Sequence, residues 1–215
     1  MTDEEYKLHF TMWAAMRSPL LIGTDIRSLD AKAYTIYTNP AILALSQDPT
    51  AASAQRIWRH YTPNNSGEIQ MWSATLAHGD QVVILLNAAT SAMNMSASLS
   101  DIFLDAGGAR SEKARSSWDV YDLWANRMPE EVARGILEAN DTLAPGANVT
   151  GRYLYNATAL SFEEGIRGNH SLLMGERVGE VRAGGEVSAE VPRHGVKAFR
   201  LRLSGSPVGR KRDEL

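Results

Sequence analysis

The stretch KLHFTMWAAMRSPLLIGTDIRSLD, residues 7–30, decides the fold of the N-terminal part of the chain. Its first half has the apolar spacing of an amphipathic helix, and Pro19 predicts the end of that helix because proline lacks a backbone N–H donor. Thr2 and Glu5 have the spacing of a capping box, so we expect the helix to begin directly after Thr2. The segment LLIG, residues 20–23, is short and wholly apolar, which predicts a strand buried on both faces, as in parallel sheets wrapped by helices.

A buried parallel strand needs hydrogen-bonded neighbours, and the rest of this chain shows no second strand of that kind. We therefore expect the chain to begin in the middle of a larger helix-and-strand unit. Residues 31–38 are expected to form a short helix. Asn39 and Pro40 predict the start of another helix that runs to about Ser46, because asparagine caps helix starts and proline fits the first helical position.

From about Gln55 the apolar pattern changes from a helical period to simple alternation, which predicts strands. The alternating segments are short and are separated by turns rich in Gly, Pro, Asn and Asp, and this arrangement is typical of an antiparallel β-sandwich. The expected strands are residues 56–61, 68–76, 81–87, 93–104, 118–124, 151–159, 177–182, 186–191 and 196–203. Residues 204–215 are polar, which predicts a disordered tail.

Residues 9–49 carry the signature of a known family. An HFxxW helix is followed by SPLLIGTDIRSL at residues 18–29 and by NPAILALSQDP at residues 39–49. This signature resembles glycoside hydrolase family 27, the alpha-galactosidases and their alpha-N-acetylgalactosaminidase relatives, in their fungal form. A looser resemblance continues to PRHGVKAFRLRL at residues 192–203, and residues 111–150 resemble an insertion of the fungal members. Ser46 departs from the pattern, since relatives commonly carry Asn there.

The resemblance implies a mostly β chain, in which an antiparallel β-sandwich follows the last helix-strand-helix piece of a (β/α)8 barrel. Residues 1–50 would be the C-terminal fragment of that catalytic barrel, residues 54–203 the sandwich and residues 204–215 the tail. The activity implied is hydrolysis of terminal α-linked galactose with retention, without a metal or an organic cofactor. The substrate expected is a galactoside or an oligosaccharide, and α-N-acetylgalactosaminides remain an open alternative.

Retaining glycosidases use two carboxylates about 5 Å apart. The family's two catalytic aspartates lie on earlier barrel strands and match no residue of this chain, so we expect no catalytic residue here and no activity of the chain alone. Asp25 follows the predicted strand at the barrel face where active sites are built, which makes it the candidate for substrate contact. An alternative interpretation is that Asp25 caps the following turn or pairs with Arg27. Asp48 is expected to fix a loop by hydrogen bonding.

A second hypothesis, from a different class, is a non-catalytic carbohydrate-binding or structural β-sandwich protein. Aromatic rings can stack on the apolar face of a sugar, but they also fill the cores of sandwiches. Both interpretations apply to the tryptophans Trp58, Trp72, Trp118 and Trp124. The five histidines have no i, i+4 or HxH spacing, so the sequence predicts no metal site.

Composition limits the partners and the compartment. A net charge of −3, a pI near 6.0 and the lack of a long basic run give no electrostatic reason to expect nucleic acid or an anionic membrane as a partner. The chain has no cysteine, which excludes thiol nucleophiles and zinc–thiolate sites.

Six of the ten asparagines lie in N-x-S/T sequons, where roughly one or two are expected by chance, which favours the secretory pathway. The predicted N-glycosylation sites are Asn64, Asn94, Asn140, Asn148, Asn156 and Asn169. The last four residues, Arg212, Asp213, Glu214 and Leu215, resemble the KDEL and HDEL signals for retrieval to the endoplasmic reticulum. The alternative is a chance polar tail.

Overall fold

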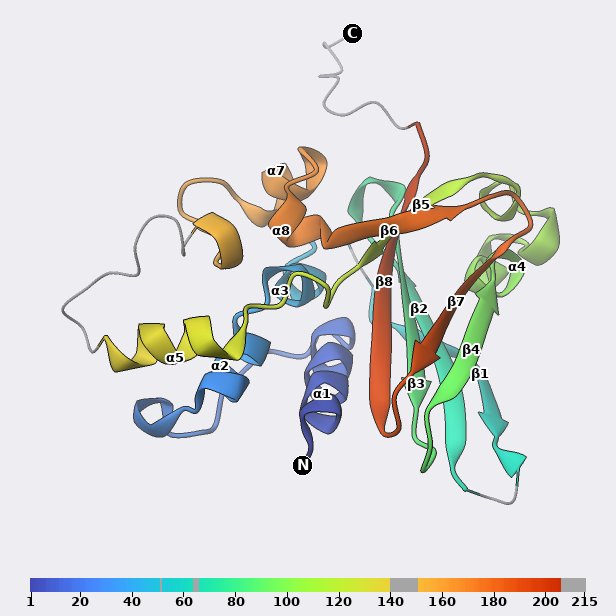
Figure 1. Ribbon diagram of the computed structural model, residues 1–215. Helices are drawn as coiled ribbons and strands as arrows, with labels where there is room; N and C mark the ends of the chain where they lie inside the picture. The colour runs from blue at the N-terminus through green and yellow to red at the C-terminus, as the bar shows by residue number, and fades with distance from the viewer. Residues whose placement is uncertain (51, 64–65, 140–150, 206–215) are drawn as a thin grey trace, which may run out of the picture.

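A computed structural model describes residues 1–50, 52–63, 66–139 and 151–205 of the chain (Figure 1). Its core is an antiparallel β-sandwich in which a six-stranded sheet of order β1-β2-β3-β8-β5-β6 packs on a two-stranded sheet of β4 and β7. The expected fold class is confirmed. The strands are β1 (Gln55–Tyr61), β2 (Glu68–Thr75), β3 (Gln81–Asn87), β4 (Met93–Ser98), β5 (Trp118–Asp122), β6 (Glu176–Val181), β7 (Glu186–Val191) and β8 (Gly195–Leu203).

The central strands β3 and β8 are covered on both faces. All seven residues of β3 are buried, because Val82 and Ile84 point into a core shared with helices whereas Val83 and Leu85 point toward the second sheet. β8 pairs with β3 and divides its apolar side chains between the same two cores. Antiparallel sheets commonly leave one face to solvent and then alternate in polarity. The continuous apolar run of β3 therefore reflects two covering layers.

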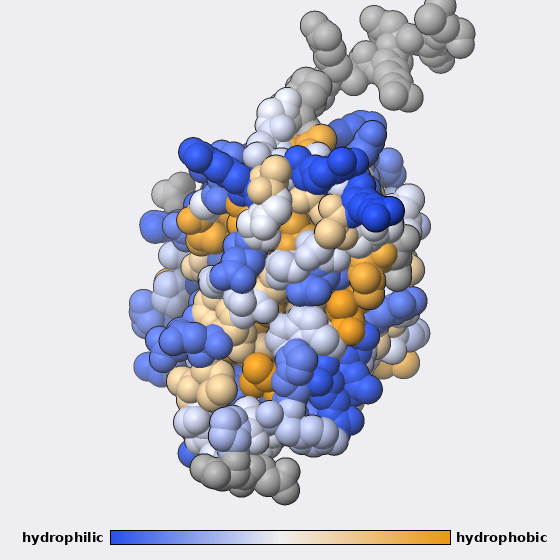
Figure 2. All heavy atoms as spheres, turned by 90° about the vertical axis from the view of Figure 1, so that its right-hand side faces the viewer, coloured by the Kyte–Doolittle hydropathy of each residue, from blue (hydrophilic) through white to orange (hydrophobic). Residues whose placement is uncertain are grey.

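The second sheet provides one of these layers. In β4, Met95 and Ala97 are buried in the core between the sheets, whereas Asn94 and Ser96 are exposed. This strand thus alternates as a strand with one solvated face should. Hydrophilic residues are interspersed with smaller hydrophobic areas on this side of the molecule (Figure 2).

Helices provide the other layer, on the opposite side of the large sheet (Figure 1). Thr2 and Glu5 form the expected capping box at the start of α1 (Asp3–Ala15). Asn39 caps α3 (Pro40–Ser46) through the backbone N–H groups of Ala41 and Ile42, with α2 (Ala31–Tyr37) preceding it. Side chains of these helices and of the sheet fill one core, so both sides of the expected domain boundary contribute to it.

Residues 20–23 form no strand in this chain, so that prediction is wrong at the level of secondary structure. α1 ends at Ala15, Arg17 adopts a positive φ of 57°, and the chain then continues without regular structure. Leu21 is 77% exposed and Ile22 is 46% exposed. The backbone of a strand needs partners on a neighbouring strand, and none of the strands that the structure describes pairs with this segment.

The predicted strand at residues 93–104 is correct only in its first half. β4 ends at Ser98, whose hydroxyl accepts from the backbone N–H of Asp101 and so starts the short helix α4 (Leu99–Ile102). The apolar side chains of this helical turn enter the core between the sheets, as those of a strand would. The sequence pattern therefore could not distinguish a helical turn from a strand here. Three 3-10 turns follow before β5: η4 (Leu104–Ala106), η5 (Gly108–Arg110) and η6 (Lys113–Arg115).

The predicted strand at residues 151–159 is absent. Residues 151–153 are helical, and residues 154–159 have no regular structure. Two tyrosines, Tyr153 and Tyr155, favoured a strand here, but Tyr155 packs against Phe162 and His170 and donates a hydrogen bond to the carbonyl of Ser161. Tertiary packing therefore overrides the strand propensity of this tyrosine. The remaining helices are α5 (Glu130–Glu138), α7 (Phe162–Arg167) and α8 (Ser171–Met174).

A buried ionic cluster joins the turn before β3 to β8 and α7. Asp80 accepts from Arg200 Nη1 at 2.9 Å and from Arg202 Nη2 at 2.6 Å. Asp80 is 1% exposed and Arg200 is fully buried. Burial lowers the pKa of the Arg200 guanidinium, and the attraction of Asp80 opposes that shift. Arg202 also donates to the carbonyl of Ile166, so the cluster fixes α7 to the sheet.

The variant Asp80→Asn should lower the free energy of unfolding by about 3–5 kcal/mol, because it leaves two buried guanidinium groups without a counter-charge. Urea unfolding followed by tryptophan fluorescence measures this loss. Asp119→Asn is the matched control, since Asp119 pairs with a half-exposed Arg177, and its loss should cost about 0–1 kcal/mol. Equal losses for the two variants would contradict the role given to the cluster.

Candidate functional site

Asp25 forms a surface ion pair in the segment after α1. Its carboxylate accepts from Arg27 Nε and Nη2, each at 2.9 Å, and from the Arg27 backbone N–H at 3.0 Å, which caps the 3-10 turn η1 (Ile26–Ser28). These hydrogen bonds from Arg27 hold the pKa of Asp25 below its usual value. An ionised, exposed carboxylate cannot serve as a general acid in this conformation. The contacts are those of the alternative interpretation, and a role of Asp25 in substrate binding stays a prediction.

Asp48 is fully buried and fixes two loops. Its two carboxylate oxygens accept from the backbone N–H of Ala77 at 3.1 and 2.9 Å, and Oδ1 also accepts from the N–H of Thr50 at 3.1 Å. Ala77 lies in η3 (Ala77–Gly79), the turn between β2 and β3. Asp48 therefore ties the segment after α3 to this hairpin, which is the loop-fixing role expected for it.

The histidines have local structural contacts. His170 caps α8, because its Nδ1 accepts from the backbone N–H of Leu172 at 3.3 Å. His194, in the turn before β8, lies 3.0 Å from the Glu5 carboxylate of α1. His60 packs on Trp58, with ring centroids 4.8 Å apart.

The described part of the chain contains neither a metal-binding cluster nor a membrane-spanning helix. No group of three or more His, Asp or Glu side chains there is arranged to hold a metal ion. No helix within that part has the length and apolar character needed to cross a bilayer.

The tryptophans do not share one surface. Trp118 and Trp124 are 2% and 6% exposed, and their indole N–H groups donate to Lys113 O and Thr11 Oγ1 inside the protein. Trp58 packs against the core between the sheets, whereas Trp72 packs against the core under the helices. Core packing is thus the main role of these rings, and the four do not form a joint platform for sugar stacking.

Three of the predicted glycosylation sites lie among the described residues, in different environments. Asn94 and Asn156 are exposed. Asn169 is half-buried, has a positive φ of 56°, and accepts a hydrogen bond from Arg202 through its side-chain oxygen. The remaining sequons, Asn64, Asn140 and Asn148, lie outside the described residues, as do Arg212, Asp213, Glu214 and Leu215.

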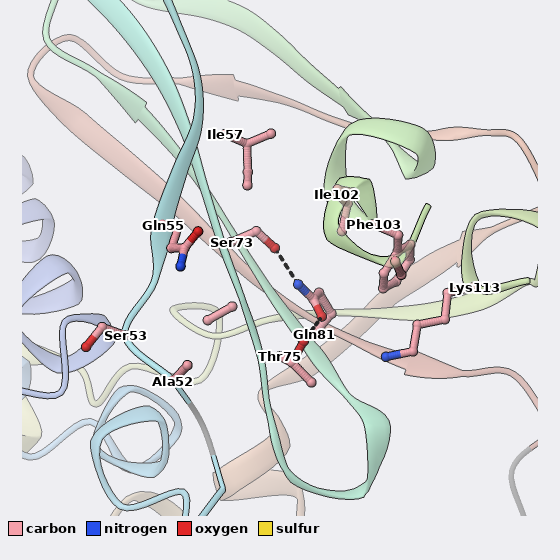
Figure 3. Close-up of a pocket in the computed structure, with 12 residues that line it drawn as sticks. Ala52, Ser53, Gln55, Ile57, Ser73, Thr75, Gln81, Ile102, Phe103 and Lys113 are labelled. Carbon is pink, nitrogen blue, oxygen red and sulfur yellow. Dashed lines mark hydrogen bonds between the residues drawn. The ribbon is translucent and has the colours of Figure 1, made fainter. Parts of the chain in front are cut away.

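A small pocket opens at one end of the sandwich, where the start of β1, the end of β2 and the start of β3 meet the segment from α4 to η6 (Figure 3). Its volume is about 130 Å³. Ile57, Ile102 and Phe103 form an apolar side, and Ser73, Thr75, Gln81 and Lys113 supply polar groups. Sequence reasoning missed this pocket. The available signal was the polar residues at inward-facing positions of β2 and β3, but their partners in α4 and η6 follow some 20–40 residues later in the chain.

Comparisons with known proteins found alpha-galactosidases that match this chain. Residues 66–149 match the model of the alpha-galactosidase C-terminal β-sandwich domain. The chain is 46% identical to an alpha-galactosidase of Saccharomyces mikatae and 45% identical to one of Saccharomyces paradoxus. Each alignment has 208 residues and covers 95% of this chain. A solved alpha-galactosidase structure from Saccharomyces cerevisiae superposes with a TM-score of 0.86 at 40% identity, over 95% of this chain. The chain matches the C-terminal part of a family 27 alpha-galactosidase.

The match extends through both halves of the chain. The family model ends at residue 149, before β6, β7 and β8, but the alignment with the yeast structure includes nearly the whole chain. An alpha-galactosidase from Mortierella vinacea has the same fold at 25% identity, with a TM-score of 0.62. This chain spans 42% of the length of the Saccharomyces mikatae relative and 44% of the solved yeast chain. The alpha-galactosidase resemblance expected from residues 9–49 is thus confirmed.

Asn169→Gln should lower the free energy of unfolding by about 1–3 kcal/mol, because glutamine is strained at positive φ and the contact with the buried Arg202 is lost. Chemical denaturation of the purified chain measures the effect. Ser171→Ala is the control, since it removes the same sequon through an exposed residue and leaves Asn169 in place. A similar loss in both variants would show that the contact with Arg202 is unimportant.

Proposed function

We propose that this chain is the C-terminal part of a retaining alpha-galactosidase, which hydrolyses terminal α-linked galactose. The observation that carries the proposal is the alignment of 95% of the chain with the yeast alpha-galactosidase at a TM-score of 0.86. A structure of the yeast protein was solved with raffinose, a trisaccharide that contains galactose, which supports a galactoside or an oligosaccharide as the substrate.

The chemistry requires two carboxylates held about 5 Å apart on either side of the scissile bond. The two aspartates considered within this chain are engaged elsewhere, Asp25 with Arg27 and Asp48 with the backbone N–H of Ala77. We assign the nucleophile and the general acid to barrel strands outside these 215 residues. The role left to this chain is to complete the barrel wall and to hold it against the sandwich.

The exposed apolar segment after α1 supports the proposal that this chain completes the wall of a barrel. Leu21, Ile22 and Ile26 are 77%, 46% and 70% exposed, although full burial of such a side chain stabilises a protein by roughly 1.5–3 kcal/mol. Residues 20–23 would be covered if they paired as a strand between two further barrel strands. Asp25 would then follow the carboxyl end of that strand, at the face where barrel enzymes build their active sites.

The 215-residue chain alone should not hydrolyse an aryl α-galactoside above background, whereas a version extended upstream through a complete barrel should. The difference should be about 10⁴-fold or more, because loss of a single catalytic group already costs that much. Release of the aryl alcohol, followed by absorbance, measures both. Turnover by the short chain that is abolished by Asp25→Asn would overturn the assignment. An inactive extended version would instead favour the non-catalytic carbohydrate-binding or structural protein.

We also propose that the protein enters the secretory pathway and carries N-linked glycans. The excess of sequons supports this proposal, and Asn94 and Asn156 are exposed, so a glycan at either needs no unfolding of the structure. A retrieval signal at Arg212, Asp213, Glu214 and Leu215 would keep part of the protein in the endoplasmic reticulum.

Deletion of the last four residues from a barrel-extended version that carries a signal peptide should raise the ratio of protein in the medium to protein in the cells. Retrieval receptors read a free C-terminus, so two glycines added after Leu215 should have the same effect. Immunoblots before and after endoglycosidase treatment give the ratio and show whether glycans are present. An unchanged ratio in both variants would reject the retrieval signal, and an unchanged band would remove the main argument for the secretory pathway.

A further inference from the structure

The pocket at the end of the sandwich is lined by polar side chains where the pattern of the fold calls for apolar ones. Ser73 and Gln81 face the space between the sheets and are 4% and 5% exposed. Their neighbours on the same face, Met71 and Val83, belong to the apolar core. Polar residues at positions where the pattern of a fold calls for apolar ones are expected at functional sites.

A chain of hydrogen bonds orients the Gln81 side chain (Figure 3). Thr75 Oγ1 donates to Gln81 Oε1 at 3.1 Å, and Gln81 Nε2 donates to Ser73 Oγ at 2.7 Å. Ser73 Oγ in turn donates to the carbonyl of Val82 at 2.8 Å. These bonds direct the amide oxygen of Gln81 toward Thr75 and its amide nitrogen toward Ser73. An amide nitrogen carries two hydrogens, and the described residues use one of the two on Gln81, which leaves one N–H for a ligand.

Among the described residues that line this pocket, Lys113 is the only one with a charged side chain. It is half-buried, and it makes no ion pair with any side chain that the structure describes. Its ammonium group lies 5.8 Å from the centroid of the Phe103 ring and points across the pocket toward Thr75 and Gln81 (Figure 3). A partly desolvated cation of this kind attracts an anion more strongly than a solvated one does.

The size of the pocket limits the ligand. A volume of about 130 Å³ admits only a small molecule. One ammonium group balances a single negative charge, which favours a monoanion over a phosphate dianion. Two separate donors, Lys113 Nζ and Gln81 Nε2, suit the two oxygens of a carboxylate.

We propose that this pocket binds a small carboxylate anion, with its oxygens between Lys113 Nζ and Gln81 Nε2 and its carbon atoms against Ile57 and Ile102. The site lies within the sandwich and uses none of the residues considered for galactoside hydrolysis. It is therefore independent of the activity proposed above.

The test compares acetate with acetamide, which have the same shape and differ in charge. The methyl groups of Ile57 and Ile102 line the pocket, so their NMR signals report occupancy in the 215-residue chain. At constant ionic strength, acetate should shift both signals with half-saturation in about the millimolar range, as expected for a ligand of so few atoms. Acetamide should shift them at least about tenfold less at the same concentration.

Lys113→Met keeps the apolar stem of the side chain and removes the charge, so it should weaken acetate binding at least about tenfold. Lys32→Met is the matched control, because Lys32 is exposed, is not among the lining residues, and its loss changes the net charge equally. Unchanged signals of buried core methyl groups will show that both variants are folded.

Three results would overturn the proposal. Equal shifts with acetamide would assign the pocket to neutral molecules, and retention of acetate binding in Lys113→Met would remove the role of the charge. Shifts that stay absent at saturating acetate would leave the pocket to water alone.

Discussion

β3 and β8 carry apolar side chains on both faces, so the large sheet is stable only where two separate layers cover it. The sheet of β4 and β7 supplies one layer, and α1 and α3 supply the other (Figure 1). The helical segment is therefore part of the folded unit and not an appendage to a sandwich. The same requirement explains why its amphipathic helices remain packed even though residues 20–23 lack neighbouring strands.

The ionic cluster of Asp80, Arg200 and Arg202 links this sheet to the second half of the helical layer. One carboxylate neutralises part of the charge of two guanidinium groups, and Arg202 extends the link to the Ile166 carbonyl and to Asn169. Arg200 is fully buried, and its Nε and Nη2 have no hydrogen-bond partner among the described residues. Its stability inside the protein thus depends on Asp80. The sandwich holds α7 in place through charges as well as through apolar contacts.

The alignment with the yeast alpha-galactosidase structure includes both the sandwich and the helices. The chain contains the sandwich and the helices that rest on it, and it exposes the apolar residues Leu21, Ile22 and Ile26 in the segment after α1. Asp25 follows the segment that was predicted to be a barrel strand, which is the position expected for a residue that contacts the substrate. Its carboxylate instead forms an ion pair with Arg27. The carboxylate pocket lies at the end of the sandwich, in a part that the proposed hydrolysis does not use. The two sites would therefore respond to different variants.

Features that depend only on residues close together in the chain could be predicted from the sequence. The capping box at Thr2, the cap at Asn39 and most strands were predicted correctly, because caps and alternation are local. Residues 20–23 and 151–159 were mistaken for strands, since a strand exists only with a partner and Tyr155 found aromatic partners instead. Only the tertiary structure decided the ionic cluster and the pocket. Asp80 and Arg200 are 120 positions apart, and no local pattern records a contact over that distance.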